Sequence, residues 1–450
     1  MIWRPRWRNV TTHTDDSPFN SRPAVRPLRL TFHITEEPAT EDAEALTVVQ
    51  NILRPELFKW LDTAEGSAQR LSIGTQIVGE DEQGVAFVTN REGDKVGEAA
   101  FWPERWREVA PSVAATSDDS RDRVQNDVMV VAGHEAWKHD LLVTTAAALL
   151  ANRNIASFID ANICSPHEAA KIVGLFLRFR EHWGFTSTWT FDANFFYSVM
   201  LRAKFEGLRS DNRLGAVQIA SDSPIAQTRY TSSVRCRRAL EALDAIGVQF
   251  YRHASWRTAE LMLYHFDYLT LLLTGAFDAA ARVARTVLDL PAKPRQIHFW
   301  KPEFLDQLTA SAPLLHNVAT SNEMVGLKAL LYRLRNKIHD ARLGEMMYSA
   351  PPAPTIIITK LHEGDWPHVY DAAETLGGAE DWGLVGVPQG GFEPYTYASR
   401  LLDTSFEVLA RIEQAIAASA VQTAAANGTT PALQATRLRP EFVRAAAVLS

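Results

Sequence analysis

The chain has 450 residues, of which 46% are hydrophobic and 22% charged, and its formal net charge is -7. This composition excludes a mainly disordered, collagenous or fibrous protein. The negative net charge means that any contact with nucleic acid must use a local patch. Cys164 and Cys236 are too few for a disulfide framework and too far apart for a CxxC pair, which favours a reducing cytoplasm.

Residues 1–25 are rich in Pro, Arg, Asp, Ser and Thr, a composition that predicts a disordered N-terminus. No apolar segment follows its basic residues, so we expect no secretory signal. The longest apolar runs are residues 141–151 and 269–281. The first is too short for a bilayer and the second contains Asp278, so both predict buried helices and no membrane partner.

Residues 26–208 show the pattern of an α+β domain with a helical extension. Alternation of apolar and polar residues predicts antiparallel strands, with a helix over 41–64 between the first two. The expected strands are 28–34, 71–78, 84–88, 96–101 and 128–131. The segment 107–127 is interpreted as a loop or linker.

Three helices are expected next, over 135–151, from Ser165 onward and over 192–208. Ser165, with Pro166 and Glu168 after it, has the pattern of a capping box. The polar, turn-rich stretch 209–230 predicts a domain boundary.

Residues 231–422 predict a mainly α-helical bundle. An irregular insertion is expected at 345–398, and a mobile tail at 423–450. The expected helices are 232–247, 256–290, 303–316, 321–343 and 399–420.

Several well-known site motifs fail on spacing. His134 and His139 are five residues apart, whereas a zinc-protease helix needs two histidines four apart on one face. The sequence has no phosphate-binding loop ending in GK[ST] and no GxSxG elbow. We therefore predict neither a metal site nor a cofactor.

The helix expected over 321–343 carries the sharpest functional pattern. Its apolar residues form a narrow stripe that predicts packing in a bundle: Met324, Leu327, Leu331, Leu334 and Ile338. Arg335 and His339 lie on one flank of that stripe, one turn apart, whereas Arg333 is expected to face solvent. An arginine and a histidine at this spacing can converge on one anion.

The segment from Leu331 to Asp340 resembles the Arg-polar-x-x-x-His motif of HEPN ribonucleases, which are small helical bundles. The preceding long helix, with its Tyr-His-Phe-Asp-Tyr and Gly-Ala-Phe-Asp segments, extends the resemblance over about residues 232–422. The family places four to six residues between Arg and His. Three residues separate Arg335 from His339 and five separate Arg333 from it, so spacing favours Arg333 and helix geometry favours Arg335.

The resemblance implies a metal-independent endoribonuclease of prokaryotic defence or toxin type, and a homodimer formed through this helix. His339 would exchange protons and Arg335 would hold the phosphorane. Asn336 would position the phosphate or His339, and Asp278 would orient Arg335 by a salt bridge. The N-terminal domain would bind a regulator. The alternatives are a catalytically silent HEPN-like binding or scaffold protein, in which these side chains are structural, and an unrecognised N-terminal enzyme.

Overall fold

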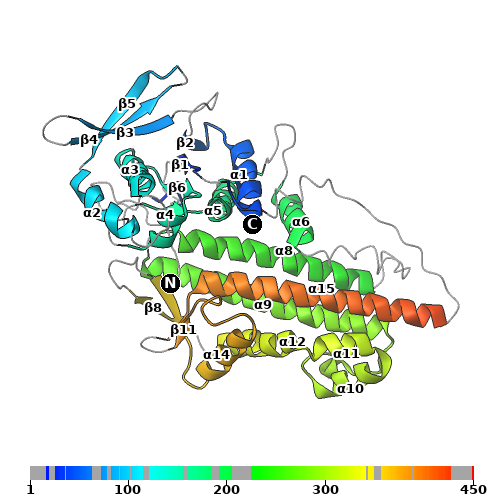
Figure 1. Cartoon of the computed structure of the whole chain (residues 1–450). Helices are drawn as coiled ribbons and strands as arrows, with labels where there is room; N and C mark the ends of the chain where they lie inside the picture. The colour runs from blue at the N-terminus through cyan, green and yellow to red at the C-terminus, as the bar shows by residue number, and fades with distance from the viewer. Residues whose placement is uncertain are drawn as a thin grey trace.

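A computed structural model shows a mixed α/β unit packed on a set of long helices (Figure 1). It describes residues 17–19, 26–35, 37–62, 72–78, 83–90, 92–101, 103–114, 121–155, 158, 161–183, 192–204, 224–252, 254–340, 343–348, 356–386, 390–426 and 448–449. The predicted order, an α+β region followed by a helical region, is confirmed.

The α/β unit is built on a seven-stranded sheet in the order β5-β4-β3-β2-β1-β6-β7. Its strands are β1 Leu28–His33, β2 Phe58–Asp62, β3 Ser72–Val78, β4 Gln83–Thr89, β5 Lys95–Phe101, β6 Leu141–Thr144 and β7 Ile163–Cys164. The antiparallel prediction holds for β3, β4 and β5. It is wrong for β1, which pairs in parallel with β2 and β6. Strands β2, β6 and β7 were not expected, and the helix expected over 41–64 is wrong beyond Ile52, because β2 follows it. Alternation shows that a strand has two faces, whereas its direction depends on the crossover helices.

Helices cover both faces of this sheet. Helices α1 (Thr40–Ile52) and α5 (Pro166–Phe179) pack on the face that carries Leu30 and Phe32. Helices α2 (Pro103–Ala114), α3 (Arg121–Ala136) and α4 (Ala147–Asn152) pack on the other. The capping box that opens α5 is confirmed, because the Glu168 main-chain N–H donates to Ser165 Oγ and the Ser165 N–H donates to Glu168 Oε2.

Two predictions for the stretch before α5 are wrong. The expected linker 107–127 lies largely in α2 and α3, and the strand expected at 128–131 is helical. The helix expected over 135–151 is interrupted by β6, which lies between β1 and β7. A short apolar run suits a buried strand as well as a buried helix, so tertiary pairing decides between them.

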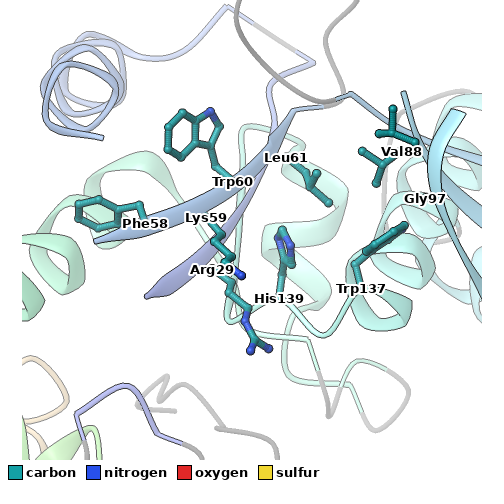
Figure 2. Close-up of a pocket in the computed structure, with 10 residues that line it drawn as sticks. Arg29, Phe58, Lys59, Trp60, Leu61, Val88, Gly97, Trp137 and His139 are labelled. Atoms are coloured by element: carbon teal, nitrogen blue, oxygen red, sulfur yellow. The ribbon is translucent and has the colours of Figure 1, made fainter. Parts of the chain in front are cut away.

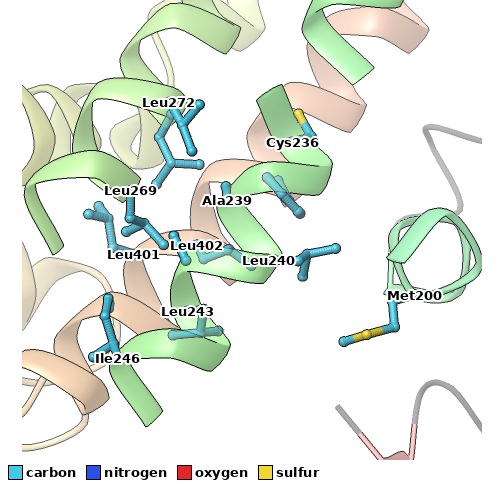
Figure 3. Packing of buried hydrophobic residues seen from close by; sticks show 14 of the residues in the cluster. Met200, Cys236, Ala239, Leu240, Leu243, Ile246, Leu269, Leu272, Leu401 and Leu402 are labelled. Atoms are coloured by element: carbon cyan, nitrogen blue, oxygen red, sulfur yellow. The ribbon is translucent and has the colours of Figure 1, made fainter. Parts of the chain in front are cut away.

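Three long helices form the centre of the C-terminal region: α8 Pro224–Phe250, α9 Trp256–Val287 and α15 Pro394–Ala426 (Figure 1). Their apolar faces interdigitate around Leu240, Leu269 and Leu402 (Figure 3). Helix α6 (Ala193–Lys204) packs on α8. The shorter helices are α10 Pro302–Ser311, α11 Pro313–Ala319, α12 Asn322–Leu327, α13 Arg333–Asp340 and α14 Trp366–Thr375.

The insertion expected to be irregular contains a small sheet in the order β10-β11-β9-β8, together with α14. The strands are β8 Gly344–Tyr348, β9 Ile356–Lys360, β10 Leu384–Val385 and β11 Gly391–Phe392. Gly377, Gly378 and Gly383 have positive φ angles in the connection between α14 and β10, so part of the apparent irregularity reflects a close connection.

One apolar core runs through both regions, from the α1/α5 face of the sheet into the long helices. Both ends of the described chain contribute to it. Phe19, inside the N-terminal segment expected to be disordered, is fully buried beside Phe176. Leu449, inside the expected mobile tail, is also fully buried. Those two predictions are therefore wrong at these positions, and the rest of 1–25 and 427–447 lies mostly outside the described residues.

The start of α8 at Pro224 falls inside the expected boundary 209–230, and residues 205–223 lie outside the described part of the chain. Among the described residues, the helices are all too short or too polar to cross a membrane.

Candidate functional site

The predicted helix over 321–343 is present, but it contains a π-helical turn, Lys328–Tyr332, between α12 and α13. The apolar stripe is confirmed, because Met324, Leu327, Leu331 and Leu334 are buried. A π-helical turn changes the direction of the side chains that follow it, and such turns are frequent at functional sites. It places Tyr332 at the junction with α13.

Arg335 is half-buried on the flank of α13, where its guanidinium carbon lies 5.4 Å from the centre of the Tyr332 ring. One of its terminal nitrogens donates to Asn336 Oδ1 at 3.3 Å. His339 follows one turn later in the same helix, and its side chain lies outside the described ones. The structure therefore places the Arg335 guanidinium against Tyr332 and Asn336.

Arg333 does not simply face solvent as expected. Its terminal nitrogen donates to Asp365 Oδ1 at 3.1 Å, just before α14. The insertion folds back over this part of α13, and that contact could not be read from the helix alone. Because its guanidinium already has a carboxylate partner, Arg333 is the weaker candidate for binding a phosphate.

Asp278 does not form the expected salt bridge with Arg335. Its Oδ1 atom lies 3.0 Å from His298 Nε2, and that same nitrogen lies 2.6 Å from the Tyr332 hydroxyl. The approach to Asp278 has an ion-pair distance without hydrogen-bond alignment, since Oδ1 has no hydrogen-bond partner among the described residues. One nitrogen carries at most one proton, so His298 Nε2 can donate to only one of these oxygens at a time.

Trp300 completes an aromatic wall around the imidazole. Its ring centre lies 5.0 Å from that of His298 and 4.8 Å from that of Tyr332. Its Nε1 atom is buried without a hydrogen-bond partner among the described groups. We refer to Asp278, His298, Trp300, Tyr332 and Arg335 as the His298 cluster. It is assembled from α9, the loop before α10, and the junction of the π-helical turn with α13.

The electrostatics of the cluster keep the Tyr332 phenol protonated. Burial raises the pKa of Tyr332 above its ordinary value, the Asp278 carboxylate raises it further, and Arg335 opposes them. The phenol therefore keeps the proton that it can donate to His298 Nε2.

Sequence reasoning missed His298 and Trp300. The available signal was the aromatic and histidine-rich segment Ile297 to Trp300, in a connection between two helices. No local pattern links this segment to Tyr332, which lies 34 positions later at the end of the π-helical turn.

Comparisons of this chain with protein-family models, with curated proteins and with solved structures found no match.

Proposed function

We propose that the chain is a metal-independent endoribonuclease, with the His298 cluster and His339 as its site. The supporting observation is one imidazole in contact with a carboxylate and a phenol, beside an arginine on the neighbouring helix face. Phosphodiester cleavage in RNA needs a proton acceptor, a proton donor and a group that stabilises negative charge on the phosphorane. The cluster contains each type of group.

The roles follow from these chemistries. An imidazole removes the proton from a ribose 2′-OH, whose oxygen attacks the adjacent phosphorus. The P–O5′ bond breaks, a 2′,3′-cyclic phosphate forms, and a second acid protonates the departing 5′-oxygen. We assign the base to His298 and the acid to His339, one turn beyond Arg335 on α13. Arg335 holds the phosphorane, since its guanidinium stays charged and binds oxyanions in a bidentate way.

The remaining assignments come from the HEPN resemblance. We propose that α13 pairs with the same helix of a second chain, which makes a homodimer with two Arg/His sets in one cleft. We also propose a cytoplasmic protein of prokaryotic defence or toxin type, whose N-terminal region binds a regulator. Asn336, which already contacts Arg335, would help to orient the guanidinium.

The alternative is a HEPN-like binding or scaffold protein without catalysis. The observation that favours it is that His298 and Tyr332 satisfy each other, and Arg333 is tied to Asp365. In that case the cluster would join α9 to α13, and RNA or a protein partner would bind without being cut.

The test is cleavage of a mixed RNA pool by the purified full chain in EDTA. Four variants accompany it: Arg335→Gln, His298→Ala, His339→Ala and, as a matched control, His368→Ala on the exposed side of α14. We expect products with 2′,3′-cyclic phosphate ends from the wild type and His368→Ala, and at least a hundredfold slower cleavage from the others, as is typical for loss of an acid, a base or an oxyanion group. Equal cleavage by all five proteins, or by none, would refute the proposal. Absence of cleavage with retained RNA binding would support the alternative.

A further inference from the structure

The α/β unit contains a cavity of about 560 Å³ that is separate from the His298 cluster. It lies against β1 and β2, and Val88 and Gly97 of the β4–β5 hairpin also line it (Figure 2). A volume of this size is typical of pockets for small molecules.

The cavity follows from how the sheet is paired. Over the described residues, β2 pairs with β1 along its whole length but with β3 only at Asp62 and Ser72. The hairpin of β4 and β5 therefore diverges from β2, and Trp137 lies at the opening between them. Gly97 makes room for this indole, since a Cβ atom there would lie 2.6 Å from the Trp137 ring.

Two cations lie side by side on the cavity wall. Arg29 of β1 and Lys59 of β2 are direct register partners, so their side chains leave the same face of the sheet (Figure 2). Like charges in directly opposed positions repel each other. The described lining residues include Arg29, Lys59 and His139 and no carboxylate.

Asp140, an acidic group close to Arg29, is already paired with another arginine. Asp140 accepts two hydrogen bonds from the Arg26 guanidinium, at 2.6 and 2.7 Å, and one from the Arg29 main-chain N–H at 2.8 Å. The Arg29 guanidinium donates to the Lys138 carbonyl at 3.1 Å, and it also interacts electrostatically with the Asp140 carboxylate. An anion placed between Arg29 and Lys59 would relieve their repulsion.

The opposite wall is flat and apolar. It is formed by the Trp137 indole with Leu61 and Val88, which form a small cluster of their own. The Trp137 Nε1 atom is buried and has no acceptor among the described groups.

His139 is held in a fixed orientation at the edge of the cavity. Its Nδ1 atom lies 3.0 Å from both the Leu30 carbonyl and Thr31 Oγ1. Thr31 Oγ1 in turn lies 3.1 Å from His134 Nδ1 in the buried polar layer between β1 and α3. A ring fixed in this way is a preorganised contact for a ligand, because little conformational entropy is lost on binding.

We propose that this cavity binds a nucleoside monophosphate, with the phosphate between Arg29 and Lys59 and the base against Trp137. Paired cations beside an aromatic face match an anion attached to a flat ring, and stacking of a base on an aromatic side chain tolerates any base. The proposal does not depend on RNA cleavage by the His298 cluster, and the site would give the α/β unit a ligand of its own.

The test is isothermal titration calorimetry of the full chain with AMP and with UMP. Adenosine and inorganic phosphate are titrated separately, to separate stacking from charge. Lys59→Gln is the main variant, because Lys59 is exposed and its replacement should leave folding unchanged by circular dichroism. Lys293→Gln, an exposed lysine on the helical region, is the matched control.

We expect AMP and UMP to bind to the wild-type chain. Lys59→Gln should raise the Kd of each nucleotide about tenfold, in line with the loss of one charged contact. Lys293→Gln should leave both Kd values unchanged. Trp137→Phe, which keeps a smaller aromatic ring for stacking, should weaken binding by a smaller factor. Equal affinity for adenosine and AMP, no binding of AMP and UMP, or no effect of Lys59→Gln would each overturn the proposal.

Discussion

Arg178 and Asp244 form a buried ion pair that joins the sheet region to the long helices, and its loss should be costly. Arg178, on α5, donates from Nε and Nη2 to the two carboxylate oxygens of Asp244 on α8, at 2.5 and 2.9 Å. A third nitrogen donates to the Leu449 carbonyl at 2.6 Å. The Tyr197 hydroxyl donates to Asp244 Oδ2 at 2.7 Å. The side chains are only 3% and 15% exposed.

Burial alone would lower the pKa of Arg178, but Asp244 outweighs it and raises the pKa, so the guanidinium stays charged. Burial also raises the pKa of Tyr197, which keeps its phenol a donor. In Arg178→Met, the carboxylate would keep the phenol but lose its counter-ion in a water-poor site. Removing one partner of a buried pair typically costs about 3–5 kcal/mol.

The assay is urea unfolding of the full chain followed by tryptophan fluorescence. The matched control is Arg411→Met, which breaks an exposed pair with Glu323 whose side chains are 41% and 43% exposed. Exposed pairs are worth at most about 1 kcal/mol. A loss of stability in Arg178→Met no larger than that in Arg411→Met would refute the claim that this pair holds the two regions together.

Three other perturbations test the local arguments. The Glu323 carboxylate accepts a main-chain hydrogen bond, which lowers the pKa of Glu323 below the ordinary 4.5. Glu323→Gln should therefore reduce stability above pH 4.5, and the difference from the wild type should vanish as the pH falls through the lowered pKa. Urea midpoints measured across this pH range check the prediction. Leu331→Ala, in the buried stripe, should cost about 2–5 kcal/mol, whereas the half-exposed Leu314→Ala should cost far less in the same assay. A Cβ atom at Gly391 would lie 2.5 Å from the Thr359 carbonyl, so Gly391→Ala should lower Tm in calorimetry, whereas Gly386→Ala, with open space around it, should not.

Local signals in the sequence were sufficient where local physics decides the structure. The capping box at Ser165 and the cap of α12, where the Met324 main-chain N–H donates to Ser321 Oγ, satisfy orphan donors within one turn. The long apolar pattern of α9 predicted a helix over 256–290, and the helix ends at Val287. These features need no knowledge of distant residues.

Sheet topology depended on distant pairing and was predicted less well. Leu141 to Thr144 form a short apolar run that fits either a helix or a strand. The run becomes β6 because β1 and β7 offer hydrogen bonds on both sides. The parallel direction of β1 and β2 follows from α1 crossing between them, a fact about the connection and not about either strand.

At the candidate site, too, local features were predicted better than distant contacts. Helical spacing correctly put Arg335 on the flank of a buried stripe, but the predicted partner of Asp278 was wrong. Arg335 and His298 both lie within reach of the Tyr332 ring, and the ion-pair distance to Asp278 belongs to His298. His298 lies on a loop whose position is fixed by aromatic contacts with Trp300 and Tyr332. A pattern restricted to one helix contains no information on that loop.

The π-helical turn connects the core to the candidate site. The turn shifts the main-chain hydrogen bonds of the helix away from the regular α-helical pattern. This shift would leave some carbonyl groups without donors inside the bundle. Tyr397, fully buried on α15, donates its hydroxyl to the Leu330 carbonyl within this turn at 3.1 Å. Burial raises the pKa of Tyr397, so the donor keeps its proton. Because the same turn ends at Tyr332, the packing of α15 also positions the phenol that contacts His298, and the geometry of the His298 cluster depends on the core as much as on its own residues.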